Sequence, residues 1–102
     1  MICAKFHFEN GIPVSFDVSG HAEFAESGSD IVCAGVTSAV NMTVNGITQV
    51  VGVSPKIVFG KDRIYAGFSE VPGECAAVLM KSLYLQLKEI EKDFPKYISV
   101  KE

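Results

Sequence analysis

Apolar and polar residues alternate along the first part of the chain, with the two-residue period of strands buried on one face. The alternation covers residues 2–8 and returns over residues 12–18. Asn10 and Gly11 stand between the two runs, and a type I′ turn needs positive φ at both of these central positions. We therefore expect a β-hairpin. Pro13 has no backbone N–H, so we expect the second strand to have a free edge near its start.

The pattern then changes to helical spacing. Residues 20–29 are rich in Gly and Ser and show no clear period, which favours a loop. Polar side chains recur every three or four positions across residues 31–51, which predicts a helix in spite of many β-branched residues. Asp30 is a favourable N-cap for this helix. Gly52 and Pro55 mark its end.

The second half of the chain repeats this outline. Lys56–Phe59 and Arg63–Phe68 read as two short strands around a turn at residues 60–62. Glu74–Phe94 carries apolar residues on one helical face and predicts an amphipathic helix. Tyr97–Val100 is long enough to add one short last strand.

The element order is ββαββα, with an optional last β. This order predicts an α+β fold: a two-layer sandwich of a mixed or antiparallel sheet, with two helices packed on one face. The length of 102 residues fits one domain over residues 1–102.

Composition narrows the function classes. The hydrophobic fraction of 48% fits a globular protein, and the net charge of −3 gives no basic footprint, so we expect no direct nucleic-acid partner. Residues 31–55 carry no charged side chain and are long enough to span a bilayer. Because Asn and Thr make one face of this helix polar, we expect a buried helix and no membrane partner.

The three cysteines, Cys3, Cys33 and Cys75, are widely spaced and form no CxxC motif. This spacing argues against a disulfide framework and against a zinc site, so we expect no metal. Free thiols favour a reducing cytoplasm. The N-terminus lacks the pattern of a signal peptide.

Candidate chemistry lies at the junction of the hairpin and the first helix. If Asp30 is the N-cap, Cys33 is the third residue of the helix, where unpaired N–H groups and the helix dipole stabilise a thiolate. His21 follows the second strand and can fold back toward this helix start. A Cys/His pair beside free N–H groups suits nucleophilic acyl chemistry with an oxyanion hole. The simpler alternative is that Cys33 is a small core residue and His21 a surface residue.

The run GHAEFAESGSDIVCAGVTSAV, residues 20–40, closely resembles the ribosomal-processing cysteine protease (Prp) family of bacteria. The resemblance implies a small, cytoplasmic, cofactor-free cysteine protease that forms a homodimer. It also implies the substrate, the N-terminal extension of a large-subunit ribosomal protein, which is removed during ribosome assembly.

By motif match, the resemblance implies that Cys33 is the nucleophile and His21 the general base. Asp30 is either the third member, orienting the imidazole, or only a helix cap. Thr37 stands where the family usually has Ser, and its extra methyl group narrows the site. The remaining candidate supporting residues are Gly20, where close backbone approach favours glycine, Ala34, and Phe24, which either contacts substrate or pins its loop to the core.

Two other function classes remain open. A non-enzymatic ribosome-assembly or peptide-binding module would use the same groove without cleaving a bond. A thiol-redox sensor would need Cys3 or Cys75 close to Cys33 as a resolving cysteine. Thiol reactivity of Cys33 separates the enzyme from the binding module.

Overall fold

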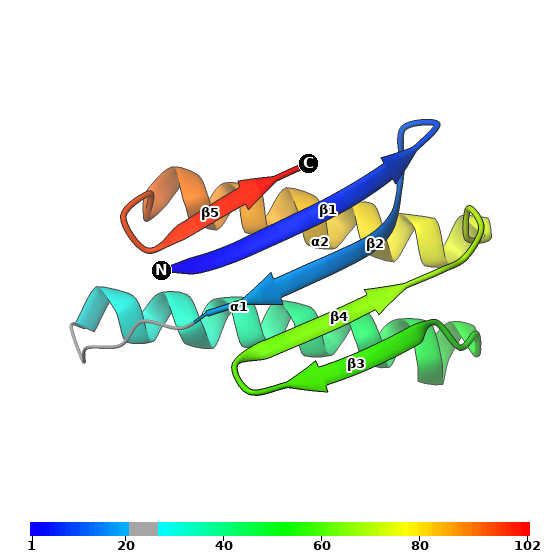
Figure 1. The fold of residues 1–102 in the computed structure, drawn as a ribbon, viewed down its shortest axis with the longest axis horizontal. Coiled ribbons are helices and arrows are strands. Elements are labelled where there is room, and N and C mark those ends of the chain that lie inside the picture. The colour runs from blue at the N-terminus through cyan, green and yellow to red at the C-terminus, as the bar shows by residue number, and fades with distance from the viewer. Residues whose placement is uncertain (21–26) are drawn as a thin grey trace.

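The chain forms a five-stranded sheet with two helices on one of its faces (Figure 1). The computed structural model describes residues 1–20 and 27–102, with the side chains of residues 27–30 excepted. The elements are β1 (Ile2–Glu9), β2 (Ile12–Ser19), α1 (Ser27–Asn45), η1 (Gly46–Val51), β3 (Lys56–Gly60), β4 (Arg63–Gly67), α2 (Glu74–Asp93) and β5 (Ile98–Lys101). The predicted element order is confirmed, and the optional last strand is present.

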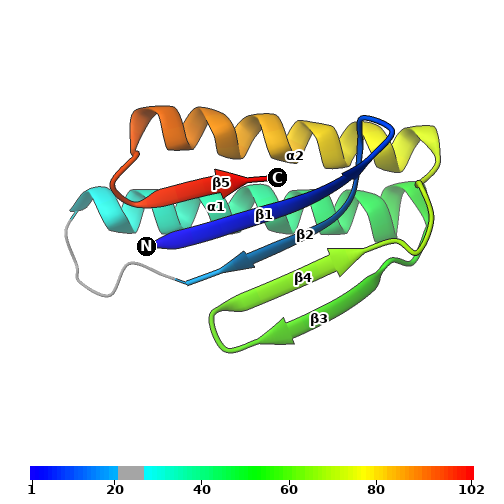
Figure 2. The same ribbon diagram turned by 45° about the horizontal axis from the view of Figure 1, so that its top comes forward.

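The sheet has the strand order β3-β4-β2-β1-β5. Strands β1 and β5 are parallel, and all other neighbours are antiparallel. Figure 2 shows α1 and α2 side by side on one face of this sheet, running roughly along the strands. The predicted two-layer sandwich with a mixed sheet is therefore confirmed.

The first hairpin forms as the sequence predicts. Asn10 and Gly11 have φ angles of 52° and 76°, the positive pair that a type I′ turn requires. Strand β4 pairs with β2 from Ser15 onward, so Pro13 lies beyond that ladder. The free edge predicted near the start of β2 is confirmed.

The hydrophobic core lies between the sheet and the two helices. Alternate residues of β1 and β2 face the helices, and Phe6 makes an edge-to-face contact with Tyr84 of α2 at a centroid distance of 5.1 Å. The buried cluster includes Phe6, Phe16, Val32, Val36, Val40, Ile47, Met80, Leu83, Leu87 and Ile98.

The first helix begins earlier than predicted. It starts at Ser27, four residues before Ile31, so the prediction that Asp30 caps it is wrong. Val32 is buried in the core, and tertiary packing of this kind stabilises a helix more than the intrinsic propensity of its first residues does. The helix continues past Asn45 as the π-helix η1 and ends at Gly52, whose φ is 82°.

Within the described residues, one helical segment, Ile31–Val51, is long and apolar enough to cross a membrane, with a mean hydropathy of 1.3. One face of this segment is buried in the core, with Val36, Val40 and Ile47 each at most 3% exposed. The buried Thr43 donates its hydroxyl to the carbonyl oxygen of Ala39 at 2.8 Å, so it carries no unpaired polar group into the core. These contacts are those of a helix packed inside a globular fold.

Candidate active site

A cavity of about 300 Å³ opens between one flank of α1 and the β3–β4 side of the sheet. Helix α1 contributes Cys33, Thr37 and Asn41, which lie one turn apart on the same flank. The strands contribute the end of β2 and the turn between β3 and β4. Among the described residues the lining consists of Ile2, Val18, Gly20, Cys33, Val36, Thr37, Val40, Asn41, Phe59, Gly60, Asp62, Arg63 and Ile64.

Cys33 is partly buried and serves two surfaces at once. It packs against the hydrophobic core, as a small apolar residue would, and it also lines the cavity. None of the three cysteines is in a disulfide. Contact with the core therefore does not exclude a role for the Cys33 thiol in the cavity.

The longer helix changes the position of Cys33 relative to the helix start. Cys33 is the seventh residue of α1, in its second turn, and not the third residue as predicted. The backbone N–H groups without an acceptor inside the helix belong to residues 27–30, one turn before Cys33. The positive end of the helix dipole lies at that same turn. If these amides stabilise the Cys33 thiolate, they must do so from a distance of about one helical turn.

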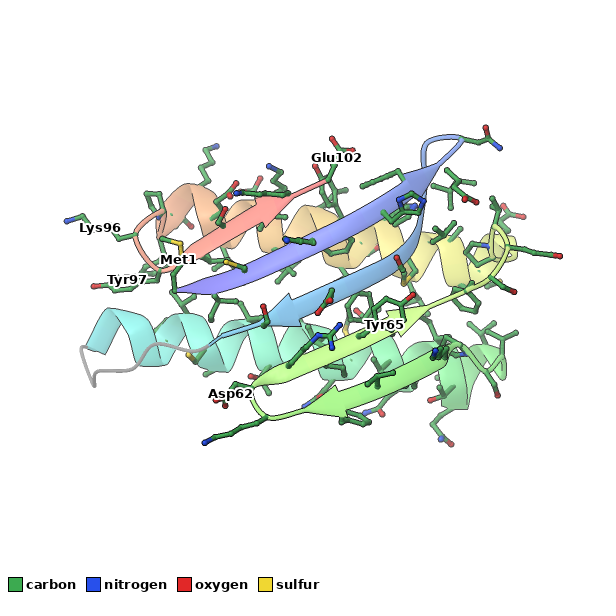
Figure 3. The ribbon with its side chains drawn as sticks, viewed as in Figure 1. Met1, Asp62, Tyr65, Lys96, Tyr97 and Glu102 are labelled. Carbon is green, nitrogen blue, oxygen red and sulfur yellow. The ribbon has the colours of Figure 1, made fainter. Side chains whose placement is uncertain are left out.

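Gly20 directly follows β2 at the edge of the cavity and is held by its backbone. Its N–H donates a hydrogen bond to the carbonyl oxygen of Asp62 at 2.8 Å. Its φ is 87°, and a Cβ placed there would meet the carbonyl oxygen of Met1. Figure 3 shows Asp62 at the turn between β3 and β4 and Met1 at the start of β1. A glycine is thus required both by the φ angle and by the close approach.

Thr37 is exposed and shares the cavity wall with Cys33. This position agrees with the expected i to i+4 placement on one helix face. Ala34 is also exposed on α1, but it does not belong to the described cavity lining.

Three of the predicted site residues lie wholly or partly outside the described residues. His21 and Phe24 lie outside the described residues. The backbone of Asp30 belongs to the first turn of α1, but its side chain is not described. The structure thus brings Cys33, Thr37 and Gly20 to one cavity.

Sequence reasoning missed the contribution of the β3–β4 hairpin. Phe59 lines the cavity although it is 74% exposed. Arg63 lines it too, and its guanidinium donates two hydrogen bonds to the Asp17 carboxylate, at 2.9 Å and 2.7 Å. These hydrogen bonds lower the pKa of the Asp17 carboxyl. Periodicity identified β3 and β4 as strands, but it cannot show which helix flank their ends face.

The described residues include no group of three or more His, Cys, Asp or Glu side chains placed to hold a metal ion. The cysteines also lie on different parts of the fold. Cys3 alternates with buried residues of β1 and points to the open face of the sheet, whereas Cys33 lies in the helix layer. Cys75 is exposed at the start of α2, at the end of the molecule opposite to the start of α1 (Figure 1). This placement gives no support to a resolving cysteine near Cys33.

Comparison with known proteins gives a consistent result. The family model described as "Cysteine protease Prp" matches residues 1–99. The chain is 38% identical over 88 residues to the ribosomal processing cysteine protease Prp of Bacillus subtilis (strain 168). That match covers 79% of this chain and 78% of the relative.

Two solved structures of the essential ribosomal processing protease Prp from S. aureus have the same fold. One, in complex with a substrate peptide, superposes with a TM-score of 0.90 at 22% identity. The other, in complex with a covalently linked product peptide, gives a TM-score of 0.89 at 23% identity. Each similarity covers 100% of both chains.

Proposed function

This chain belongs to the cysteine protease Prp family, and from that membership we propose that it removes the N-terminal extension of a large-subunit ribosomal protein during ribosome assembly. A cysteine protease needs one accessible thiol beside a space that can hold a peptide. The observation that carries the assignment is the cavity: of the three cysteines, Cys33 alone lines it. Because the family is one of cysteine proteases, bond cleavage is favoured over a peptide-binding module that cleaves nothing.

The proposed reaction has two stages. The Cys33 sulfur attacks the scissile carbonyl carbon while His21 takes the thiol proton and passes it to the departing amine. This stage breaks the peptide bond, forms a thioester and releases the mature ribosomal protein. Water, deprotonated by His21, then attacks the thioester carbonyl carbon; the C–S bond breaks, His21 returns the proton to the Cys33 sulfur, and the extension leaves with a free C-terminal carboxyl group. Free amides in the first turn of α1, one turn before Cys33, are the proposed donors to the oxyanion; this role requires that the bound peptide place its scissile carbonyl oxygen over that turn, within about 3 Å of them.

The other residues of the motif have supporting roles in this proposal. Asp30 orients the imidazole of His21 through its carboxylate. Gly20, anchored through its N–H to Asp62, fixes the backbone immediately before His21. For Phe24, which lies outside the described residues, both predicted roles stay open: contact with the substrate or contact with the core. Ala34 and Thr37 continue the helix surface next to the nucleophile.

The cavity suits a peptide with apolar side chains. Its wall combines aliphatic groups of the core side with the ring of Phe59, while Thr37 and Asn41 supply polar groups along the helix flank. The only charges in the described lining belong to Asp62 and Arg63 at the hairpin turn, and Arg63 is already paired with Asp17. We therefore expect recognition of the extension mainly by shape and apolar contact near the cleaved bond.

We further propose that the protein is a homodimer in the cytoplasm. The outer surface of the helix layer exposes apolar side chains, with Met42 60% and Leu85 63% exposed, and α1 carries no basic residue in its last turn. Such a face suits a second copy. A reducing cytoplasm keeps the nucleophile as a thiol. Sedimentation of the protein at increasing concentration tests the dimer; a monomer throughout would contradict it.

The decisive experiment is cleavage of a peptide that spans the extension and its junction with the mature ribosomal protein, read by mass spectrometry. We expect one cut at the junction, and no cut with Cys33→Ala. Cys75→Ala is the matched control, since it removes an exposed thiol at the start of the other helix. Full cleavage by Cys33→Ala, or loss of cleavage in both variants, would contradict the assignment.

A further inference from the structure

The two edges of the sheet are treated differently by the rest of the fold. At the β5 edge, the backbone N–H of Val100 donates to the Glu91 carboxylate at 2.6 Å. The Val100 carbonyl oxygen accepts from the Lys88 ammonium at 3.3 Å. Both side chains come from α2, so the helix occupies the hydrogen-bonding groups of Val100 on this edge. Covering an edge in this way prevents another strand from adding there.

The β3 edge has no such cover among the described residues. Strand β3 pairs with β4 on one side, and its other side carries no ladder. Four of its five residues are exposed, including Val58 at 39% and Phe59 at 74%. An exposed apolar edge strand attracts other extended chains, and natural proteins usually protect it. The unpaired side of β3 is therefore available to an added strand.

This open edge is continuous with the nucleophile's cavity. Phe59 and Gly60, the last two residues of β3, line the cavity together with Cys33. The flank of α1 that faces this space presents Thr37 and Asn41, which are exposed. A strip of unpaired backbone and a strip of uncovered helix thus border the same cavity.

We propose that the substrate peptide binds as an extended sixth strand along the free edge of β3, and that the residues following this strand pass from the end of β3 into the cavity that Cys33 lines. This inference rests on the proposed function. Backbone hydrogen bonds to β3 supply binding that depends little on sequence, and alternate side chains point toward the α1 flank or toward the open face of the sheet. Residues whose side chains point toward α1 enter the cavity and are read by Phe59 and Thr37.

The first test is a scan of the peptide substrate in which one backbone amide at a time is N-methylated, which removes one donor. In a peptide paired with β3, the N–H groups of every second peptide residue point toward β3. We expect kcat/KM to fall about three- to tenfold at alternate positions, as for the loss of one hydrogen bond each, and to change little between them. Cleavage that is indifferent to methylation, or that falls without a two-residue period, would overturn the docking mode.

The second test measures hydrogen exchange of the β3 amides in the Cys33→Ala variant with the uncut peptide bound. We expect slower exchange at alternate residues of β3, with the Val100 amide unchanged as an internal control for the covered edge. Binding with unchanged β3 exchange would overturn the proposal. Concentration-dependent protection of β3 without peptide would also overturn it, because a second copy would then occupy the edge.

Failure of the proposed function gives a different result from failure of the docking mode. If the unmodified peptide is neither cut by the unaltered protein nor bound by Cys33→Ala, the proposed substrate is wrong and the sixth strand has no occupant. If it is cut at one bond but β3 is not engaged, only the docking mode is wrong.

Discussion

The backbone N–H of Gly20 donates a hydrogen bond to the carbonyl oxygen of Asp62 at 2.8 Å, which ties the end of β2 to the β3–β4 turn. The residue after this bond is His21, the proposed general base. The turn that accepts the bond belongs to the same hairpin that carries Phe59 into the cavity. One hydrogen bond therefore links the start of the base-bearing segment to the proposed substrate-binding strand.

Replacing Gly20 by alanine tests this link. A side chain at φ 87° costs about 1–2 kcal/mol, and its Cβ would also meet the Met1 carbonyl oxygen. We expect Gly20→Ala to lower the free energy of unfolding by about 2 kcal/mol or more and to reduce kcat/KM as well, since the end of β2 must move. Urea denaturation and peptide cleavage measure the two effects.

Gly11→Ala is the matched control. Gly11 also has a positive φ, 76°, but a Cβ there meets nothing within 4 Å. It should therefore show the conformational cost alone, about 1 kcal/mol, with unchanged cleavage. Equal losses of stability in the two variants would show that the contact with Met1 is relieved at no cost.

Thr37 tests whether the hydroxyl or the methyl group matters on the cavity wall. Thr37→Val keeps the shape and removes the hydroxyl, and we expect kcat/KM to fall several-fold. Thr37→Ser keeps the hydroxyl and widens the cavity, so its kcat/KM should equal or exceed that of the unaltered protein. Thr48→Val is the control, because its hydroxyl bonds to the Val44 carbonyl oxygen away from the described cavity lining. A Thr37→Val rate equal to that of Thr48→Val would remove the hydroxyl from the mechanism.

Asp30 is best tested by a change that removes only charge. The helix begins at Ser27, so Asp30 is not the N-cap, and loss of a cap cannot explain an effect of Asp30→Asn. If Asp30 orients His21, kcat should fall by about tenfold or more while the thermal midpoint changes little. Glu74→Gln makes the same kind of change in the first turn of α2 and should leave kcat unchanged. A normal rate for Asp30→Asn would exclude it from the catalytic group.

Local sequence patterns predict most of the secondary structure of this fold. The two-residue period and the Asn10-Gly11 pair determine the first hairpin, and the apolar stripe of α2 determines the second helix within a residue. The start of α1 was misplaced because Ser27 and Gly28 resemble a loop in composition, whereas packing of the following turn stabilises the helix. Helix termini depend on tertiary contacts that periodicity does not contain.

The candidate site also has a part that local spacing predicts and a part that it does not. Cys33 and Thr37 share a helix face, which spacing alone predicts. The approach of Gly20 to Asp62 and the facing of Phe59 toward α1 depend on how two hairpins lie side by side in the sheet. That arrangement is a long-range property, so no local pattern could reveal the β3 side of the cavity.

The last prediction concerns the covered edge at β5. The N–H of Val100, with help from Lys88, lowers the pKa of the Glu91 carboxyl. A carboxyl whose pKa is lower in the folded state stabilises the fold above its unfolded pKa, and this contribution disappears as the pH falls through the folded pKa. Glu91→Gln should therefore reduce the free energy of unfolding at pH 7 by about 1 kcal/mol and make little difference at a pH below the folded pKa.

Chemical denaturation at several pH values measures this difference. Glu89→Gln, an exposed carboxyl on the same helix, serves as the control and should show a smaller, weakly pH-dependent change. A constant gap between Glu91→Gln and the unaltered protein across the acidic range would contradict the ionised hydrogen bond to Val100. Because this bond also covers the β5 edge, Glu91→Ala should expose that edge and raise self-association, which light scattering detects, while the β3 edge remains as it was.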